Sequence, residues 1–167
     1  SYKTDEQYDA WDRALELFEE ERYLASYRAF LHYLLDGKED NVQYDEANGK
    51  LSFTIYQGSK KISGEADHQR LVAEAKIAVA PSFDPAFLSR LLKQNFGLRY
   101  SRFSLDEQNN IAIKFDSYSV DASPYKLYYA LRELAISADK QDDLLLDEFR
   151  MLEAIDVDHL QALPQEE

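Results

Sequence analysis

The chain has 167 residues, of which 45% are hydrophobic and 13% aromatic, enough to bury the core of one domain. It contains no cysteine, which excludes disulfides, thiolate nucleophiles and cysteine-based metal sites and makes the cytoplasm the expected compartment. The formal net charge of −13 disfavours nucleic acid and anionic membranes as partners, because binding them requires Lys and Arg to neutralise phosphates. No stretch approaches the roughly 20 apolar residues of a membrane span, and the first residues lack the pattern of a signal peptide.

The negative charge is concentrated at the two ends of the sequence. Residues 1–48 carry 13 acids and 5 bases, residues 49–138 carry 9 acids and 12 bases, and residues 139–167 carry 10 acids and 2 bases. Solvated acidic faces on terminal helices explain this distribution. Repulsion of nonspecific partners from the mildly basic middle is the alternative.

The first forty residues predict two helices. Thr4 and Gln7 have the spacing of a capping box, which indicates a helix start. Apolar residues then recur every three or four positions, at Tyr8, Trp11, Leu15 and Phe18 and again at Tyr23, Tyr27, Phe30, Leu31, Leu34 and Leu35. We expect helices over about 5–20 and 23–36, the second ending at Gly37. One long helix is the alternative, because neither Gly nor Pro interrupts the join.

An alternating pattern from Val42 onward predicts a meander of antiparallel strands. Turns at Asn48-Gly49 and Gly58-Ser59 delimit one strand, and a further strand is expected over 60–65. The inward face of the first of these comprises Leu51, Phe53 and Ile55, and that of a longer strand comprises Leu71, Ala73, Ala75, Ile77 and Val79.

Pro81 ends the long strand, and Asp84-Pro85 predicts the N-cap and first residue of a helix that ends at Gly97. Phe83 and Leu88 are placed to form a hydrophobic staple at its start. Its predicted buried face comprises Phe87, Leu88, Leu91, Leu92 and Phe96.

Two further strands are predicted over about 99–105 and 110–117, joined by a polar turn, with Ile111, Ile113 and Phe115 facing inward. Ser123-Pro124 repeats the signal of a cap followed by proline and begins a helix that extends to about Ala138. We expect a shorter helix around 142–155 to complete the fold and the tail from Leu163 to fray.

The predicted fold class is therefore α+β, with an antiparallel sheet of about five strands covered by helices. The order is helix, strands, helix, two strands, helix, with an extra N-terminal helix. We expect the helical hairpin of residues 1–38 and the α+β domain of residues 39–167 to form one compact unit.

This order of elements is similar to that of YbjN-like proteins and class I type III secretion chaperones. The resemblance covers residues 23–150 and includes the stretches Gly49-Lys-Leu-Ser-Phe-Thr-Ile-Tyr, Ala75-Lys-Ile-Ala-Val-Ala-Pro and Asn110-Ile-Ala-Ile-Lys-Phe-Asp. It implies a bacterial, acidic, dimeric protein that holds an extended segment of a protein partner and has no catalytic residues.

The N-terminal hairpin resembles a single tetratricopeptide unit, in which small and aromatic residues interlock two antiparallel helices. The residues that carry this resemblance are Ala14-Leu-Glu-Leu-Phe, Tyr23, Ser26, Phe30 and Tyr33. One such unit cannot bury its own face without neighbours, so we interpret the hairpin as a cap on the core. A remnant of a longer peptide-binding array is the alternative.

No pattern in the sequence predicts a metal, a cofactor or a catalytic residue. His32, His68 and His159 lie far apart, and His32 with Asp36 at four residues' separation indicates a surface contact. Asp156, Asp158 and His159 are close together but lack the acidic pattern and glycine of an EF-hand loop. The five glycines are expected singly at turns, at Gly37, Gly49, Gly58, Gly64 and Gly97, which excludes a phosphate-binding loop.

The helix after Pro124 is apolar on two faces. One face comprises Leu127, Leu131, Leu134 and Ala138, and the opposite face comprises Tyr125, Tyr129, Arg132 and Ile136. We predict that this second set binds a partner, because Tyr and Arg are enriched at interface centres. Packing beneath a C-terminal helix around Leu144, Leu145 and Phe149 is the alternative.

The function predicted from the sequence is that of a noncatalytic, chaperone-like protein-binding module. Its partner would be another protein or a second copy of the chain. The alternatives are a homodimeric structural scaffold and a small-molecule-binding protein or enzyme whose cleft forms only on folding.

Overall fold

The computed structural model describes residues 3–79, 85–108, 110–148 and 153–154. The chain divides into two compact units. The first comprises Ser1–Ile55, Ser63–Ala73 and Asp116–Tyr129, and the second comprises Tyr56–Ile62, Glu74–Phe115 and Ala130–Glu167.

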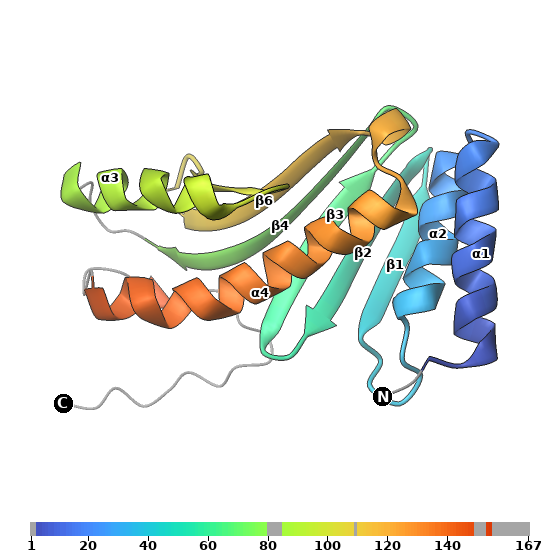
Figure 1. The fold of residues 1–167 in the computed structure, drawn as a ribbon, viewed down its shortest axis with the longest axis horizontal. Helices are drawn as coiled ribbons and strands as arrows, with labels where there is room; N and C mark the ends of the chain where they lie inside the picture. Colours follow the sequence, from blue (N-terminus) through green and yellow to red (C-terminus); the bar gives the residue numbers. More distant parts are fainter. Residues whose placement is uncertain (1–2, 80–84, 109, 149–152, 155–167) are drawn as a thin grey trace. The chain divides into compact units, whose positions relative to one another are not determined.

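The structure confirms the predicted α+β class, with one antiparallel sheet and helices (Figure 1). Its described helices are α1 (Asp5–Glu19), α2 (Tyr23–Leu34), α3 (Pro85–Gln94), α4 (Pro124–Glu148) and the short 3-10 helices η1 (Asn95–Gly97) and η2 (Ser119–Asp121). Its described strands are β1 (Val42–Ala47), β2 (Lys50–Gln57), β3 (Lys60–Ala66), β4 (Arg70–Val79), β5 (Arg102–Leu105), β6 (Asn110–Tyr118) and β7 (Glu153–Ala154). The strand order is β1-β2-β3-β4-β6-β5, and β7 pairs with β4.

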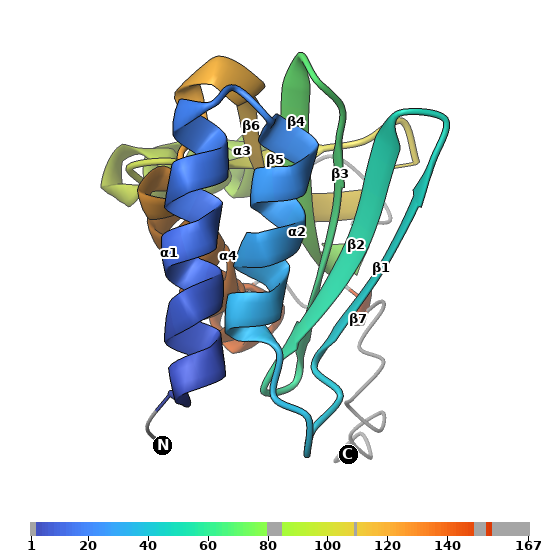
Figure 2. The ribbon, with the colours of Figure 1, turned by 90° about the vertical axis from the view of Figure 1, so that its right-hand side faces the viewer.

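The helix α1 begins at the predicted capping box. The Thr4 hydroxyl accepts the backbone N–H of Gln7 at 3.2 Å, and the Gln7 side chain accepts the backbone N–H of Thr4 at 2.9 Å. The Gln7 amide also donates to the carbonyl of Leu35 at 2.9 Å. The start of α1 is thereby fixed to the end of α2, and the two helices lie side by side and antiparallel (Figures 1 and 2).

The join between α1 and α2 is a helix stop, so the alternative of one long helix is wrong. Glu21 has a left-handed backbone with φ 60°. Its N–H donates to the carbonyl of Phe18 at 2.9 Å, and the N–H of Arg22 donates to that of Leu17 at 2.9 Å. These two bonds form a Schellman motif, which ends a helix by satisfying its last carbonyls.

The β1–β2 hairpin has the predicted two-residue turn. Ala47 pairs with Lys50, and the intervening Asn48 and Gly49 have φ values of 55° and 75°. Both residues are left-handed, as in a type I′ turn, whose twist matches that of the flanking strands. The predicted inward face of β2 is confirmed, because Leu51, Phe53 and Ile55 are all buried.

Gly64 lies within β3, so its predicted place at a turn is wrong. An added Cβ atom there would lie 2.1 Å from Cζ of Phe53. The missing side chain therefore makes room for the Phe53 ring on the neighbouring strand, a packing arrangement that the hydrophobic pattern does not reveal.

In the second unit, the inward face of β6 is confirmed by the burial of Ile111, Ile113 and Phe115. The strand β5 begins at Arg102 rather than near residue 99. The reason is that the backbone N–H groups of residues 99–101 donate to the carboxylate of Glu133 instead of to a neighbouring strand, at 2.8, 2.9 and 2.9 Å.

The predicted buried face of α3 is partly wrong. Leu91 is buried, but Leu92 is 65% exposed and Phe96 is 92% exposed. Leu92 is rotated by about 100° from Leu91, and Phe96 lies on η1, whose tighter 3-10 winding breaks the helical period. Phe83 and the side chains of Phe87 and Leu88 lie outside the described residues.

The last helix is longer than predicted. One 25-residue helix, α4, extends from Pro124 to Glu148 in place of helices ending near 138 and beginning near 142. The physical reason is that neither Gly nor Pro follows Pro124 within this range, and Ala, Leu, Lys and Gln around residue 140 favour helix. The end of the predicted second helix and the tail from Leu163 lie outside the described residues.

Candidate protein-binding surfaces

The predicted two-sided character of α4 agrees with the burial of its side chains. The Ser123 hydroxyl caps the helix by accepting the N–H of Lys126 at 3.2 Å. The inward set is buried, at Leu127, Leu131, Leu134 and Ala138. The predicted partner-binding set is exposed, with Tyr125 at 56%, Tyr129 at 50% and Ile136 at 53%, and with Arg132 also exposed. We call Tyr125, Tyr129, Arg132 and Ile136 the α4 stripe.

In the described part of the chain, no separate helix follows α4. Leu144 and Leu145 belong to α4 itself, which continues without a break to Glu148. The alternative of packing beneath a separate C-terminal helix therefore stays a prediction for the residues beyond Glu148. Phe149 lies outside the described residues.

The first residues of the α4 stripe rest on aromatic side chains of the N-terminal helices. The ring of Tyr125 meets Trp11 edge to face, with centroids 5.1 Å apart, and Tyr128 meets the same indole at 6.4 Å. Trp11 also contacts Tyr33 of α2 at 5.0 Å. Edge-to-face contacts of this kind are favourable beyond the area they bury. Tyr125 is therefore held in place while about half of its surface remains open to solvent.

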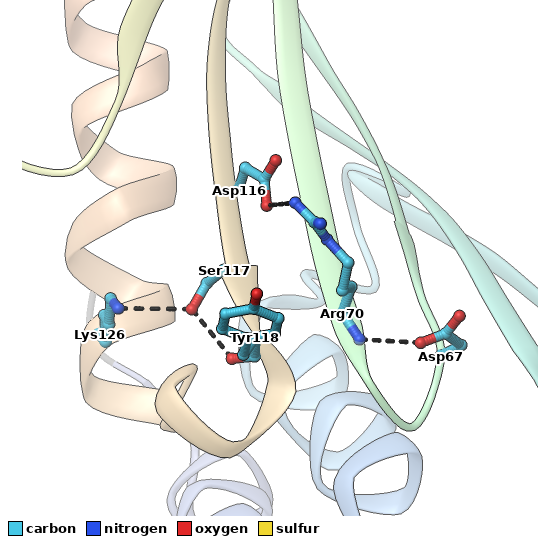
Figure 3. Close-up of polar contacts among 6 residues, drawn as sticks. All are labelled: Asp67, Arg70, Asp116, Ser117, Tyr118 and Lys126. Atoms are coloured by element: carbon cyan, nitrogen blue, oxygen red, sulfur yellow. Dashed lines mark hydrogen bonds and ion pairs between the residues drawn. The ribbon is translucent and has the colours of Figure 1, made fainter.

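A polar corner in the first unit positions the start of α4 (Figure 3). Arg70 of β4 forms an ion pair with Asp116 of β6, and its guanidinium lies 5.6 Å from the centroid of the Tyr118 ring. The ammonium of Lys126 donates to the hydroxyl of Ser117 at 3.4 Å, which links the first turn of α4 to β6. The corner thus orients the helix that bears the stripe.

The turn η2 before α4 is fixed by buried hydrogen bonds. Ser119 donates its N–H to the carbonyl of Gln69 at 2.8 Å and its hydroxyl to that of Asp67 at 2.9 Å. The Tyr27 hydroxyl donates to the carbonyl of Ser119 at 3.2 Å, and burial raises the pKa of Tyr27 to about 12. Hydrogen bonds from the backbone N–H groups of Arg70 and Gln69 lower the pKa of Asp67.

The strand β1 lies at one edge of the described sheet and pairs there with β2 alone. A two-residue hairpin makes Ala47 and Lys50 a hydrogen-bonded pair, so the N–H and C=O groups of residues 42, 44 and 46 point away from β2. Side chains of α2 contact this strand, through His32 with the Tyr44 hydroxyl at 2.7 Å and through an ion pair between Arg28 and Glu46. These contacts hold the edge strand in place.

The described residues hold few buried groups capable of chemistry. Their buried polar side chains are Ser26, Lys60, Ser101, Ser117 and Ser119, which include no pair of acids. No group of three metal-ligating side chains occurs in the part of the chain that the structure describes, and residues 156–159 lie outside it. His32 contacts Tyr44, and the ring of His68 packs at a tilt against Tyr23 with ring centroids 5.2 Å apart. None of the described helices is long and apolar enough to cross a membrane.

No protein-family model and no curated protein matches the chain. Among solved structures, it is similar to the type III secretion chaperone SycH of Yersinia pestis in complex with a stable fragment of YscM2. The identity is 16% and the TM-score 0.49, over 76% of this chain and 98% of that chain. It is also similar to a chain of the HopA1–SchA chaperone–effector complex, with 12% identity and a TM-score of 0.48, over 76% of this chain and 94% of that chain.

A third likeness is to a chain of the heterodimeric ExoU–SpcU complex from the type III secretion system of Pseudomonas aeruginosa. The identity is 11% and the TM-score 0.41, over 69% of this chain and 93% of that chain. Likenesses at this level of identity and overlap assign neither a family nor a function. The surfaces of the chain itself therefore support what is proposed below.

Proposed function

We propose that the chain is a noncatalytic protein-binding module that holds a segment of a partner protein on the α4 stripe. The observation that supports this most directly is the exposure of Tyr125, Tyr129 and Ile136, each by half or more, on a helix whose opposite face is buried. Tyr and Arg bury large areas while keeping a polar end, which suits them to the centre of an interface. A cytoplasmic location belongs to the same proposal, because a chain without cysteine needs no oxidising compartment.

The open edge of β1 offers a second way to hold an extended segment. Main-chain groups at residues 42, 44 and 46 point outward and can pair with an added strand. Such pairing is tolerant of sequence, whereas the α4 stripe selects by side chain. The two features together suit a chaperone-like protein that binds its partner in an extended form.

The stripe is tested by changing Tyr129→Asp together with Ile136→Asp. We expect loss of at least about tenfold in affinity for the partner, because aspartates in an apolar interface are buried without a counter-charge. The measurement is capture from a lysate of the source cells by the immobilised chain, with the retained protein identified by mass spectrometry and its affinity then measured by calorimetry.

The matched control carries the same change of charge at exposed positions elsewhere, Gln57→Asp with Gln108→Asp, and should retain the partner. Thermal unfolding followed by circular dichroism should be unchanged in both variants. Unfolding of the stripe variant would show that the stripe belongs to the core, and retention of a small molecule instead of a protein would argue against the proposed function.

A homodimeric scaffold is the second candidate. It is favoured by the exposure of the large apolar side chains of Leu92 and Phe96, which lie four residues apart in the second unit.

A further inference from the structure

The exposed end of the α4 stripe belongs to a larger set of aromatic side chains in the first unit. The indole of Trp11 contacts Tyr33, Tyr125 and Tyr128, and Tyr128 contacts Tyr129 with centroids 5.3 Å apart. Burial raises the pKa of Tyr33, with smaller contributions from its neighbours Tyr128 and Tyr8. We call Tyr8, Trp11, Tyr33, Tyr125, Tyr128 and Tyr129 the aromatic platform. Of its members, Tyr8, Tyr125 and Tyr129 are each at least 50% exposed.

The aromatic platform already binds one cation of the chain itself. The ammonium of Lys3 lies 4.5 Å from the centroid of the Tyr33 ring and donates to the Tyr33 carbonyl at 3.0 Å. Tyrosine and tryptophan rings attract ammonium and guanidinium groups because the ring faces carry negative charge density. The faces of the exposed rings at Tyr8, Tyr125 and Tyr129 offer the same interaction to a cation from outside.

Acidic residues border the platform along α1. Tyr8 and Leu15 are seven residues apart and lie on one line of the helix surface, and Asp5, Asp12 and Glu19 form the adjoining line, three or four residues from them. All three acids are exposed. The one base of α1, Arg13, forms an ion pair with Glu16 at 3.7 Å. The border of the platform therefore carries net negative charge.

We propose that the aromatic platform binds a segment of the partner protein that carries Lys or Arg side chains among apolar ones. This inference rests on the proposed function and names the chemistry of the partner. Apolar side chains of the segment lie against the rings, its cations lie over the ring faces, and Asp5, Asp12 and Glu19 attract it. A second copy of this chain is disfavoured as the occupant, because each copy carries a net charge of −13.

The size of α1 sets the length of the segment. A helix of 15 residues is about 22 Å long, and an extended chain covers this distance with about seven residues. Two or three cations fit within such a segment. Single exposed ion pairs are weak, so two or three of them acting with the rings are needed for useful affinity.

Trp11 is the only tryptophan in the chain, so its fluorescence reports on the platform alone. The test is a titration of the full chain with a nine-residue peptide of three Gly-Leu-Lys repeats with blocked ends. Its counterpart of three Gly-Leu-Glu repeats has the same apolar content. We expect a saturable change in Trp11 emission with the lysine peptide, at least about tenfold weaker binding of the glutamate peptide, and weaker binding as salt is raised.

Two variants separate the contributions of charge and of the rings. Asp5→Asn, Asp12→Asn and Glu19→Gln together should weaken the lysine peptide about tenfold, whereas the control Asp40→Asn, Glu107→Gln and Asp139→Asn, with the same change of net charge at exposed positions, should not. Tyr8→Leu keeps the apolar bulk but removes an exposed ring, and should weaken the lysine peptide without affecting the glutamate peptide. Circular dichroism confirms that each variant folds.

Equal binding of the two peptides would overturn the inference and leave the proposed function intact, since an apolar platform would then bind without regard to charge. Absence of binding by either peptide to the folded chain would also overturn it. So would sedimentation showing a dimer that these α1 substitutions dissociate, because a second copy would then occupy the platform. Failure of the proposed function is recognised separately, because Ile136 belongs to the α4 stripe but not to the platform. Ile136→Asp alone would then leave capture of the protein partner unchanged.

Discussion

Gly64 and Phe53 show how one residue constrains the sheet of the first unit. The ring of Phe53 occupies the space in which a side chain at residue 64 would lie, and its atoms are between 2.1 and 2.7 Å from an added Cβ. Phe53 is itself buried, so it has little room to move aside. A larger residue at position 64 therefore forces a strained rotamer or a shift of the backbone.

We expect Gly64→Ala to lower the free energy of unfolding by about 1–3 kcal/mol, the usual cost of overpacking a core. The measurement is urea denaturation followed by circular dichroism. Gly37→Ala is the control, because no atom lies within 4 Å of the added Cβ at that position. Equal stability of the Gly64 variant and the wild type would mean that the Phe53 ring can adopt another position without a loss of stability.

At the scale of single residues, the sequence indicates local structure but not which residues of different strands are in contact. The capping residues Thr4 and Ser123 are recognisable because each one bonds to a backbone group three residues ahead. The Gly64–Phe53 contact joins two strands, and alternation of apolar residues indicates which face Phe53 occupies but not which residue lies beneath it.

At the scale of elements, Glu133 ties α4 to the segment that leads into β5. Its carboxylate accepts the N–H groups of residues 99–101 and the hydroxyl of Ser101, the last at 2.6 Å. Burial raises the pKa of this carboxyl group, but the hydrogen bonds from Ser101 and from the backbone of Arg99, Tyr100 and Ser101 outweigh it, so the pKa lies below its ordinary 4.5. One acid thus satisfies three backbone groups that no strand pairs.

Glu133→Gln should lower the free energy of unfolding by about 1–2 kcal/mol at pH 7, because an amide keeps one acceptor oxygen but loses the charge. A lowered pKa in the folded state contributes stability above about 4.5, which is lost as the pH falls through the folded value. The difference in the free energy of unfolding between the variant and the wild type should therefore become smaller below about pH 4.5. Urea denaturation at pH 7 and pH 3.5 measures this difference. A difference that is the same at both pH values would contradict the role of Glu133 as a charged acceptor.

The elements that the sequence predicts well have their signals in neighbouring residues. The N-terminal capping box, the Asn48-Gly49 turn and Pro85 at the start of α3 all act within four residues of themselves. The length of α4 follows from local residues that the division into two helices did not weigh, whereas the late start of β5 has no local cause. Glu133 lies more than thirty residues from the groups it binds, and only the fold brings them together.

At the scale of the whole molecule, the exposed pair Leu92 and Phe96 is the feature that bears on self-association. Hydrophobic periodicity places both residues in the core, and the structure places them in solvent. A dimer would reconcile the hydrophobic pattern with the structure of the single chain, because the second copy would bury Leu92 and Phe96. The sequence therefore predicts the apolar character of this face but not what covers it.

We expect the wild-type chain to form dimers at micromolar concentration and Phe96→Asp to shift it to monomers, because the aspartate would be buried without a partner in the interface. Sedimentation velocity measures the change. Gln43→Asp, with the same change of charge in the other unit, should leave the dimer intact. A wild-type chain that is already monomeric at these concentrations would contradict the homodimeric scaffold.

The sequence also predicts the four residues of the α4 stripe, since helical spacing alone separates them from Leu127 and Leu131. It does not predict the aromatic platform. Trp11 and Tyr125 are separated by more than one hundred residues, and nothing near either of them indicates that they meet. The binding role of the stripe remains a prediction until a partner is known.

The open edge of β1 has a consequence for how the protein behaves when it is concentrated. A strand edge of this kind is a template on which further copies can polymerise into fibres. Asp45 lies on this edge strand, and the strand contains no lysine or arginine. Two such edges brought together would set the Asp45 carboxylates close to each other, so this acid disfavours pairing of the chain with itself, while a foreign strand bearing positive charge can still be admitted.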